Sequence, residues 1–328
     1  MALEVSRTSV DSKDKIVVCL VGFRNAADVM RCLPALAAQT FTAFEVVICE
    51  NGGIEALAAL AAVVPDRLDA GQAVTLIADH SNPGYAGGIN RCIAARPDAG
   101  AYWVLNPDTV PYPEALAAMA ELVFSGAGDA IGGPIVLPDG LLRTCGGRWS
   151  PWLAYSRAIA NGTPLAACPT AEEVEPHLSF ISGASLLVSQ RLIAEAGLMR
   201  EDYFLYGEEV EWCLRAKAKG LRLRFSPAAV VLHYQGTTTG SAHDISGRPR
   251  LAIFCDERNR ILTLRDTASF PVFAIGAIGA GLTVLIRYGR RLAFRALRHA
   301  LAGWWAGLCN RRGKPAWMTN PKEAQCEV

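Results

Sequence analysis

The chain has 328 residues, of which 51% are hydrophobic and 19% charged, and its formal net charge is +1. This composition excludes a disordered chain and predicts a globular protein with one sizeable domain and an appendage, or with two small domains. The ten cysteines form no C-x-x-C pair, and several lie inside apolar runs, which favours buried free thiols in a reducing cytoplasm.

Strands and helices alternate in the first half of the chain. Near-continuous apolar runs predict four buried parallel strands, at 16–23, 45–50, 74–78 and 101–105. Segments of helical length and composition lie between them, at 26–39, 54–64 and 85–96. This repetition predicts an α/β fold with an open sheet and right-handed crossovers. Ligands of such sheets bind beyond the carboxyl ends of the strands, so polar residues there are candidates for a site.

Polar residues and glycines follow each of the four predicted strands. The candidates are Phe23 and Asn25 after the first strand, Glu50 at the end of the second, Asn82, Gly84, Gly87, Gly88 and Asn90 after the third, and Asn106 and Asp108 after the fourth. Taken alone, each has an ordinary structural explanation, such as a turn, a helix cap or close helix packing. Their order and spacing are more specific than any single one of them.

Three carboxylates gather after an aromatic turn at 203–206. They are Glu208, Glu209 and Glu211. Gly207 precedes them and adopts positive φ without steric cost, so a helix is predicted to begin here. A well-started surface helix is the ordinary explanation, because the helix dipole stabilises carboxylates in a first turn. The predicted elements are a helix over 208–219 and then a strand over 221–234 that contains His233.

The strand ends and the acidic turn together resemble the inverting family 2 glycosyltransferases of the GT-A fold, especially bacterial rhamnosyltransferase-like members. The resemblance implies that Glu50, where Asp is usual, contacts the base or ribose of a nucleotide, and that the loop at 82–90 shapes the nucleotide pocket. It also implies a divalent metal, Mg²⁺ or Mn²⁺, held by Asp108 and His233, with Asn106 in place of the family's first Asp. One carboxylate suffices for a cation that keeps waters and takes oxygens from the diphosphate.

The same resemblance assigns the acid–base chemistry. A sugar hydroxyl attacks an anomeric carbon poorly until a positioned base takes its proton. By its place in the motif Glu209 is the implied base, with Glu208 and Glu211 as the alternatives. The implied donor is a dTDP- or UDP-sugar, and the branch suggests dTDP-rhamnose or a related sugar. The implied acceptor is a glycan or lipid-linked glycan of cell-surface polysaccharide biosynthesis.

Two other classes of function are weaker alternatives. A nucleotide-binding oxidoreductase also begins with strand, helix and strand, but the G-x-G-x-x-G expected after its first strand is absent, because that segment offers only Gly22. A non-catalytic carbohydrate-binding module would leave Asp108, Glu209 and His233 without a shared task. We therefore predict an enzyme, a glycosyltransferase of the hexosyltransferase type.

The middle and the link that follows it are less regular. Short extended runs with glycine and proline over 129–176 predict a mixed sheet or hairpin, with a mobile loop at 163–176. The aromatic residues Trp149, Trp152 and Tyr155 are expected to stack on a sugar or to form a small core cluster. The glycine- and threonine-rich link at 235–247 is expected to lie over the donor site.

The C-terminal part combines an apolar run with a basic segment. A helix is predicted over 250–265, where Arg258-Asn259 resembles an Arg-Asn of the same branch, and 267–286 is an uncharged run near the length that crosses a bilayer core of ~30 Å. From Arg287 onward, nine basic and two acidic residues give a formal charge of +7, which leaves −6 on the residues before it. This pattern predicts attachment to an anionic membrane surface rather than a spanning helix. A surface helix packed on the protein's own core is the alternative, and nucleic acid is not an expected partner.

The predicted organisation has three parts. They are a flexible N-terminus at 1–15 without an export signal, a GT-A domain at 16–246 with a nucleotide-sugar half (16–128) and an acceptor half (129–246), and a helical membrane-associating region at 247–328. The expected location is cytoplasmic and peripheral, on the inner face of the cell membrane.

Overall fold

The first half of the chain follows the predicted alternation closely. The computed structural model describes residues 15–234 and 247–318, and the fold is given for those ranges. The elements of the first half are β1 (Ile16–Gly22), α1 (Ala26–Ala37), β2 (Phe44–Glu50), α2 (Ile54–Ala61), β3 (Val74–Ala78), α3 (Gly84–Ala95) and β4 (Ala101–Leu105). The bounds of each strand lie within one residue of the prediction.

The middle of the chain contains shorter elements. They are β5 (Thr109–Pro111), α4 (Ala115–Phe124), β6 (Ala130–Gly132), β7 (Ile135–Val136), β8 (Leu142–Thr144), β9 (Gly147–Ser150), β10 (Tyr155–Ala158), η2 (Leu165–Ala167), α5 (Ala171–Val174), η3 (Glu175–His177), β11 (Ser185–Ser189), α6 (Gln190–Ala196), η4 (Glu201–Tyr203), α7 (Glu208–Ala218), β12 (Leu223–Phe225) and β13 (Val231–His233). Most of these strands are too short to show a clear apolar period in the sequence.

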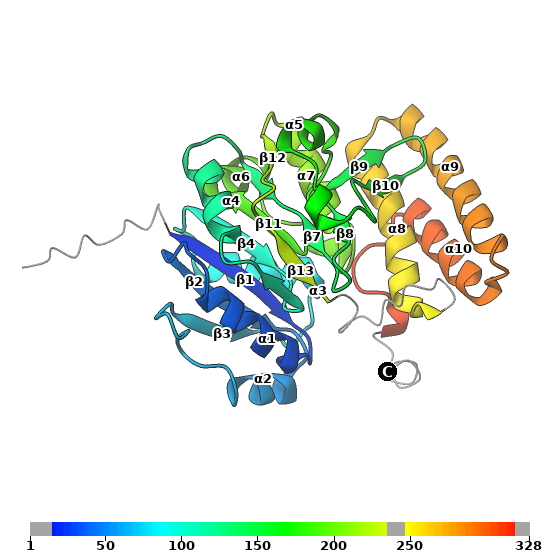
Figure 1. The fold of residues 1–328 in the computed structure, drawn as a ribbon. Helices are drawn as coiled ribbons and strands as arrows, with labels where there is room; N and C mark the ends of the chain where they lie inside the picture. Colours follow the sequence, from blue (N-terminus) through cyan, green and yellow to red (C-terminus); the bar gives the residue numbers. More distant parts are fainter. Residues whose placement is uncertain (1–14, 235–246, 319–328) are drawn as a thin grey trace, which may run out of the picture.

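A seven-stranded mixed sheet forms the centre of the molecule (Figure 1). Its strand order is β12-β6-β11-β4-β1-β2-β3. The strand β1 pairs in parallel with β2 and β4, whereas β11 pairs antiparallel with β4 and joins the two halves of the sheet. A four-stranded sheet, β5-β13-β7-β8, and the β9–β10 hairpin accompany it.

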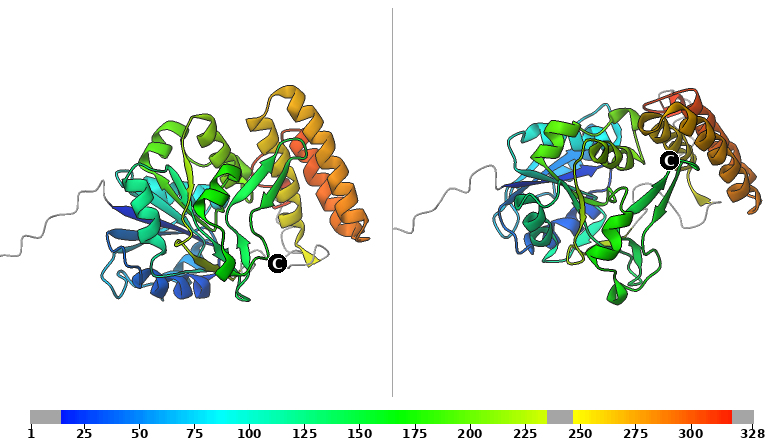
Figure 2. Two further views of the ribbon diagram at one scale, coloured as in Figure 1. Left: turned by 45° about the horizontal axis from the view of Figure 1, so that its top comes forward. Right: turned by 90° about the horizontal axis from the view of Figure 1, so that it is seen from above.

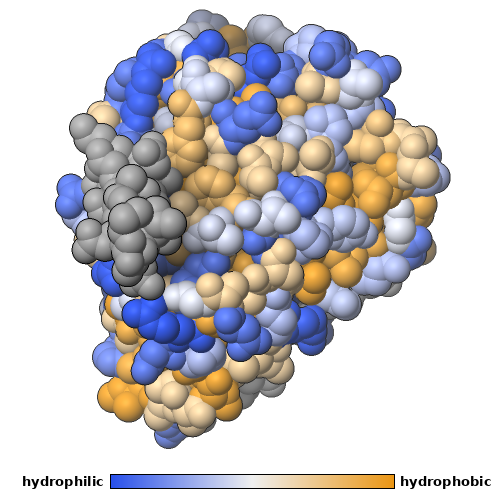
Figure 3. All heavy atoms as spheres, turned by 60° about the vertical axis from the view of Figure 1, so that its left-hand side comes forward, coloured by the Kyte–Doolittle hydropathy of each residue, from blue (hydrophilic) through white to orange (hydrophobic). Residues whose placement is uncertain are grey.

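Helices cover both faces of the large sheet (Figures 1 and 2). On one face α3, α6 and α7 pack on β1 residues such as Val17 and Cys19, and on the other α1, α2 and α4 pack on Ile16 and Val18. Burial on both faces explains why these strands have continuous apolar sequences. On the side of the molecule shown in Figure 3, hydrophilic and hydrophobic residues are intermixed.

Residues 221–234 form two strands, not the single strand predicted. The strand β12 extends the large sheet beside β6, whereas β13 lies between β5 and β7 in the small sheet. Pro227 lies in the turn between them, where the Ala229 N–H donates to the Ser226 carbonyl over 3.1 Å. The reason for the difference is that proline supplies no N–H to a continuous ladder. The change of sheet brings His233 to the end of β4.

The loop predicted to be mobile, at 163–176, contains regular structure, so that prediction is wrong. It includes η2, α5 and the start of η3. Helix α5 begins with a capping box, in which the Thr170 N–H donates to the Glu173 carboxylate over 2.9 Å. This Thr-x-x-Glu pattern is a local helix start that the sequence already contained. The predicted cover of the donor site falls almost wholly on 235–246, which lie outside the described residues.

Three helices follow, α8 (Arg250–Thr267), α9 (Phe270–Gly289) and α10 (Phe294–Leu308), with a short turn η6 (Ala316–Met318) after them. They lie side by side at one end of the molecule (Figures 1 and 2). Glycines allow the close contacts: a Cβ on Gly307 would lie 2.7 Å from the Arg258 carbonyl oxygen, and Gly279 faces the backbone of Trp152 in the β9–β10 turn. Trp149 packs with the same helices and is therefore a core residue.

Candidate active site

The ends of β4 and β13 bring Asp108 and His233 together. Asp108 directly precedes β5, which pairs with β13 so that His233 lies opposite Thr109. The Tyr234 N–H donates to the Asp108 carbonyl over 3.0 Å. His233 Nε2 lies 3.0 Å from Asp108 Oδ1, and the Asp108 side chain is buried. The structure thus places the two predicted metal ligands in contact, through strand pairing that the sequence did not reveal.

Glu50 closes the turn after β2. Its Oε1 accepts the backbone N–H groups of Arg24 over 3.1 Å and of Gly52 over 2.7 Å. The side chain is only 1% exposed. Glu50 therefore connects the ends of β1 and β2, and its expected contact with a nucleotide remains a prediction.

A cavity of about 340 Å³ opens beside these two strand ends. Its lining residues are Arg24, Ala26, Gly52, Glu55, Ala56 and Ala59. Phe23 is exposed at the same end of β1, where Asn25 Oδ1 accepts its N–H over 2.9 Å. The cavity thus lies beyond the carboxyl ends of parallel strands, where open α/β sheets bind their ligands.

The loop after β3 packs directly against the aromatic turn, residues 203–206. The Tyr85 N–H donates to the Phe204 carbonyl over 2.9 Å. Gly84 has φ +81°, and any side chain on it would collide with that same carbonyl. Asn51 Nδ2 donates to the Gly84 carbonyl over 2.9 Å. The donor-side loop and the aromatic turn therefore form one contact surface.

Other predicted residues of this loop shape its backbone. Asn82 has φ +50° and its Oδ1 accepts the Gly84 N–H over 3.4 Å. Gly87 and Gly88 lie in the first turns of α3, where a Cβ on Gly88 would lie 2.7 Å from a methyl group of Val21. Gly88 thus lets α3 approach β1 closely, so its role in the structure is packing.

The segment just before β11 connects the end of β4 with the start of α7. The Asn106 N–H donates to the Ala184 carbonyl over 3.1 Å. Gly183 lies against Glu209, because a Cβ on Gly183 would be 3.5 Å from both Cβ and Cγ of that residue. Tyr85 Oη donates to the Gly183 carbonyl over 2.9 Å. The end of β4, the loop at residues 82–90 and Glu209 therefore meet at the segment just before β11.

The carboxyl groups at the start of α7 are electrostatically strained. Glu208 is 3% exposed, and its Oε2 accepts no hydrogen bond from the described part of the chain. Burial, together with the neighbouring Glu209 carboxylate, raises the pKa of Glu208 to about 8. Burial also raises the pKa of Glu209, and the Asp256 carboxylate of α8 adds to that effect. A carboxyl group with a raised pKa beside a substrate wall is suited to accept a proton.

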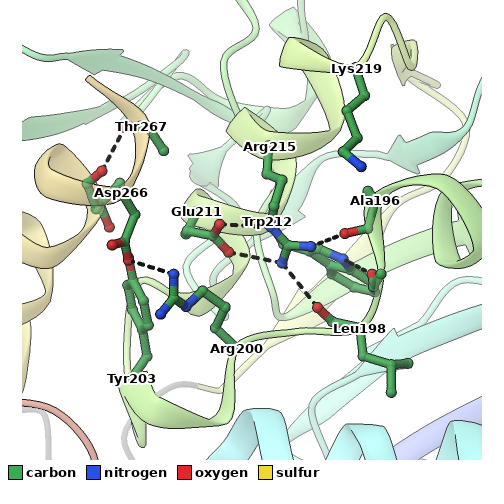
Figure 4. A network of polar contacts seen from close by, with 12 residues as sticks. Ala196, Leu198, Arg200, Tyr203, Glu211, Trp212, Arg215, Lys219, Asp266 and Thr267 are labelled. Atoms are coloured by element: carbon green, nitrogen blue, oxygen red, sulfur yellow. Dashed lines mark hydrogen bonds and ion pairs between the residues drawn. The ribbon is translucent and has the colours of Figure 1, made fainter. Parts of the chain in front are cut away.

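Two residues that the sequence placed in the site are engaged elsewhere. Glu211 is 2% exposed, and its two oxygens accept hydrogen bonds from Arg215 over 2.7 and 3.0 Å (Figure 4). Asn90 is buried, and its Nδ2 donates to the Met199 carbonyl and to Glu201 Oε1 over 2.9 and 3.0 Å. We therefore leave Glu211 and Asn90 out of the proposed site. The i, i+4 spacing of Glu211 and Arg215 is a sequence feature from which this pairing could have been predicted.

Sequence reasoning missed Tyr85 and Gly183 as parts of the site. Tyr85 is partly buried, and desolvation raises its pKa well above the usual range, with further contributions from Glu208, Glu209 and Asp108. Its hydroxyl group donates to the Gly183 carbonyl, next to Glu209. Tyr85 lies inside the glycine-rich loop and could have been singled out there, whereas nothing in the sequence around Gly183 distinguishes it.

The two contacting side chains Asp108 and His233 fit a divalent cation. No cluster of three or more His, Cys, Asp or Glu side chains suited to a metal occurs within 15–234 and 247–318. A pair of protein ligands is nevertheless enough for Mg²⁺ or Mn²⁺ that keeps waters and binds substrate phosphates. The 3.0 Å contact places a carboxylate oxygen and an imidazole nitrogen side by side. The donor set therefore suits a cation shared with a diphosphate.

The fold and site define a class of protein. A parallel nucleotide-binding half, an antiparallel β11 that continues the sheet, and a polar strand end that faces carboxylates on α7 describe a glycosyltransferase of the GT-A fold. The model of the family described as "Glycosyltransferase like family 2" matches residues 15–250, and the chain belongs to this family. It is thus a transferase that uses a nucleotide sugar.

Named relatives are distant. The chain is 25% identical over 246 residues to the N-acetylglucosaminyl-diphospho-decaprenol L-rhamnosyltransferase of Mycobacterium tuberculosis. The aligned region covers 69% of this chain and 78% of that protein. It is 24% identical over 161 residues to the low-salt glycan biosynthesis hexosyltransferase Agl10 of Haloferax volcanii, covering 47% and 50% of the two chains. A solved structure of S. aureus TarS 1–349 in complex with UDP aligns with a TM-score of 0.48 at 12% identity, covering 84% and 72%.

Proposed function

We propose that the protein transfers rhamnose or a related sugar from a nucleotide-diphosphate donor to a hydroxyl of a glycan or lipid-linked acceptor, with inversion at the anomeric carbon. The observation that carries the proposal is the position of Glu209, whose carboxyl group has a raised pKa and lies on the wall formed by Gly183 and Tyr85. The similarity to a rhamnosyltransferase named for a lipid-linked diphosphate substrate supports this choice of donor sugar and acceptor.

In this mechanism Glu209 takes the proton of the attacking hydroxyl. The hydroxyl attacks from the face opposite the departing nucleotide diphosphate, so one displacement inverts the anomeric carbon. Glu208 holds a proton near neutral pH, because its pKa is about 8. The negative charge of Glu209 is one cause of that raised pKa, so we assign Glu209 as the ionised member of the pair. A divalent cation bound by Asp108 and His233 would offset the charge that develops on the departing diphosphate.

Product analysis tests the proposal. The full chain is incubated with Mg²⁺ or Mn²⁺, a panel of nucleotide sugars that includes dTDP-rhamnose, and a short-chain polyprenyl-diphospho-N-acetylglucosamine acceptor. We expect one new glycosidic bond whose anomeric configuration, read by NMR, is opposite to that of the donor. Retained configuration would contradict the single displacement, and the absence of transfer from every donor would contradict the choice of acceptor.

We extend the proposal to the location of the enzyme, at the inner face of the cell membrane. Helix α9 is long and apolar enough to cross a membrane, with mean hydropathy 1.8, by length and composition alone. In the structure one side of it is buried against the protein, at Gly276, Ala277, Ala280, Val284 and Tyr288. The other side exposes Phe270, Ile275, Ile278, Leu282, Leu285 and Ile286. A helix with one protein side and one exposed apolar side suits a bilayer surface better than a span.

Flotation with anionic vesicles tests this location. Placing charge on the exposed side of α9, as in the double variant Ile278→Glu and Leu282→Glu, should lower the vesicle-bound fraction at least about 10-fold, because two apolar side chains lose their burial in the bilayer. The matched control is Ile54→Glu, which alters an exposed isoleucine far along the chain on α2. Wild-type protein that stays with the soluble fraction would rule out membrane attachment.

A further inference from the structure

Two neighbouring residues of α8, Arg258 and Asn259, hold the aromatic turn from behind. Asn259 Nδ2 lies within hydrogen-bond distance of three carbonyl oxygens of the turn, those of Tyr203 at 3.0 Å, Leu205 at 2.8 Å and Tyr206 at 2.6 Å. Arg258 Nη2 donates to the Tyr203 carbonyl over 2.7 Å, and its Nε donates to Asn259 Oδ1 over 2.9 Å. Both side chains are 1% exposed. Burial of a charged guanidinium group is unfavourable unless its N–H groups are hydrogen-bonded, and here they bind backbone carbonyls of the turn and the Asn259 side chain.

The turn adopts a backbone conformation that it would not keep by itself. Phe204 and Tyr206 have φ +66° and +71°, in the left-handed region that side chains other than glycine disfavour, and Gly207 follows with φ +82°. Such residues persist only where the surroundings determine their conformation, and they concentrate at functional sites. The carbonyl groups that Asn259 and Arg258 bind belong to this turn.

The turn connects the two sides of the active site. Its Phe204 carbonyl accepts the N–H of Tyr85 in the donor-side loop. Its last residue leads through Gly207 directly into the first turn of α7, which carries Glu209. A displacement of the turn therefore disturbs both the position of the proposed base and the contact with the donor-side loop.

A second set of contacts holds the start of the turn to the C-terminal helices. Tyr203 Oη donates to Asp266 Oδ2 over 2.9 Å, and Arg200 binds the same carboxylate over 3.2 Å (Figure 4). Arg312 also binds it, over 2.6 Å. Arg258 Nη1 also donates to the carbonyl of Gly313, after α10, over 2.6 Å. The region proposed to contact the membrane is thus bonded to the turn that leads to the base.

From this geometry we infer that Arg258 and Asn259 are positioning residues for sugar transfer: through the aromatic turn they set Glu209 and the donor-side loop relative to each other. The inference rests on the proposed function for its catalytic consequence, but its geometric part does not. Neither residue contacts the proposed site directly. Their effect passes through the backbone of residues 203–207.

Kinetics of Asn259→Ala test the catalytic part. Because a misplacement near 1 Å costs up to about 100-fold in rate, we expect kcat to fall between about 10-fold and 100-fold while the donor KM changes little. The acid limb of the kcat profile should move to lower pH, since a displaced Glu209 is better solvated and its pKa falls. Arg258→Lys, which keeps the charge and some donors, should retain more activity than Arg258→Ala. The matched control is Asn161→Ala, which removes a hydrogen bond from a side-chain amide to the Arg143 carbonyl, away from the site.

Hydrogen exchange of the full chain tests the geometric part without any substrate. In Asn259→Ala the Tyr85 amide should exchange at least about 10-fold faster, although Asn259 does not touch it, because its acceptor on Phe204 moves. If Asn259→Ala does not fold, the same measurement is made on Asn259→Gln, which misplaces the amide by one methylene. Unchanged exchange at Tyr85, or lower kcat with an unshifted pH profile, would overturn the inference. If the wild-type protein transfers no sugar but the Tyr85 amide still exchanges faster in Asn259→Ala than in the wild-type protein, only the proposed function is contradicted.

Discussion

Two buried glutamates at opposite sides of the site have opposite surroundings. Glu50, after β2, is 1% exposed, and its Oε1 accepts two backbone N–H groups. Glu208, at the start of α7, is 3% exposed, and its Oε2 accepts none from the described residues. A buried carboxylate whose oxygen accepts two N–H groups stabilises a turn, whereas burial of a carboxylate with one oxygen lacking a donor favours its protonated form and raises its pKa. The difference supports the proposal that proton transfer takes place on the α7 side of the site.

The largest expected effect comes from removing the proton acceptor on the α7 side. Glu209→Gln keeps the shape and hydrogen-bonding capacity but cannot accept the proton, so kcat should fall about 100-fold or more with donor KM nearly intact. Steady-state kinetics measure it, with Glu195→Gln, an exposed carboxylate on α6, as the control. Near-normal turnover of Glu209→Gln would move the base to Glu208.

The next effect concerns the end of β4. Asp108→Ala removes the only carboxylate of the proposed metal pair, so metal-dependent binding of a nucleoside diphosphate should weaken at least about 10-fold while the fold survives. Calorimetric titration with and without a chelator measures the difference. Equal affinity of the wild-type protein in both conditions would remove Asp108 and His233 from the metal site.

The smallest effect sharpens the contrast between the two glutamates. Glu208→Gln replaces a carboxyl group that is protonated near neutral pH by a neutral amide, so the acid limb of the kcat profile, which reports Glu209, should stay where it is. Stability gives a second readout. The native state keeps the Glu208 proton up to about pH 8, whereas the unfolded chain releases it near its ordinary pKa of 4.5.

The sign of the stability effect follows from that difference in bound protons. Between about pH 4.5 and 8 the native state binds more protons than the unfolded state at Glu208, so the free energy of unfolding decreases as pH rises through this window. In Glu208→Gln this contribution to the slope should vanish, which denaturant titrations at several pH values would show. An unchanged slope would mean that Glu208 is ionised in the folded protein.

The first half of the fold was predictable because burial of parallel strands on both faces leaves a continuous apolar pattern. The paired strands around His233 were not, since β5, β7 and β13 have two or three residues each and depend on partners distant in the chain. In the site, the order of polar strand ends pointed to Asp108, and the acidic motif after the aromatic turn pointed to Glu209. The engagement of Asn90 with residues 199–201 depends on tertiary contacts that no local pattern encodes.

The contacts that hold the aromatic turn also bear on the order in which the enzyme folds during translation. The groups that bind the turn come from Tyr85 and from Arg258 and Asn259 on α8. Beyond α10, Arg312 binds Asp266 and the Gly313 carbonyl accepts a hydrogen bond from Arg258. A ribosome adds about 5–20 residues per second, and domains form from the N-terminus onward. Until α8 has been translated, the chain therefore lacks the two residues that hold the aromatic turn, and with it the proposed base, in place.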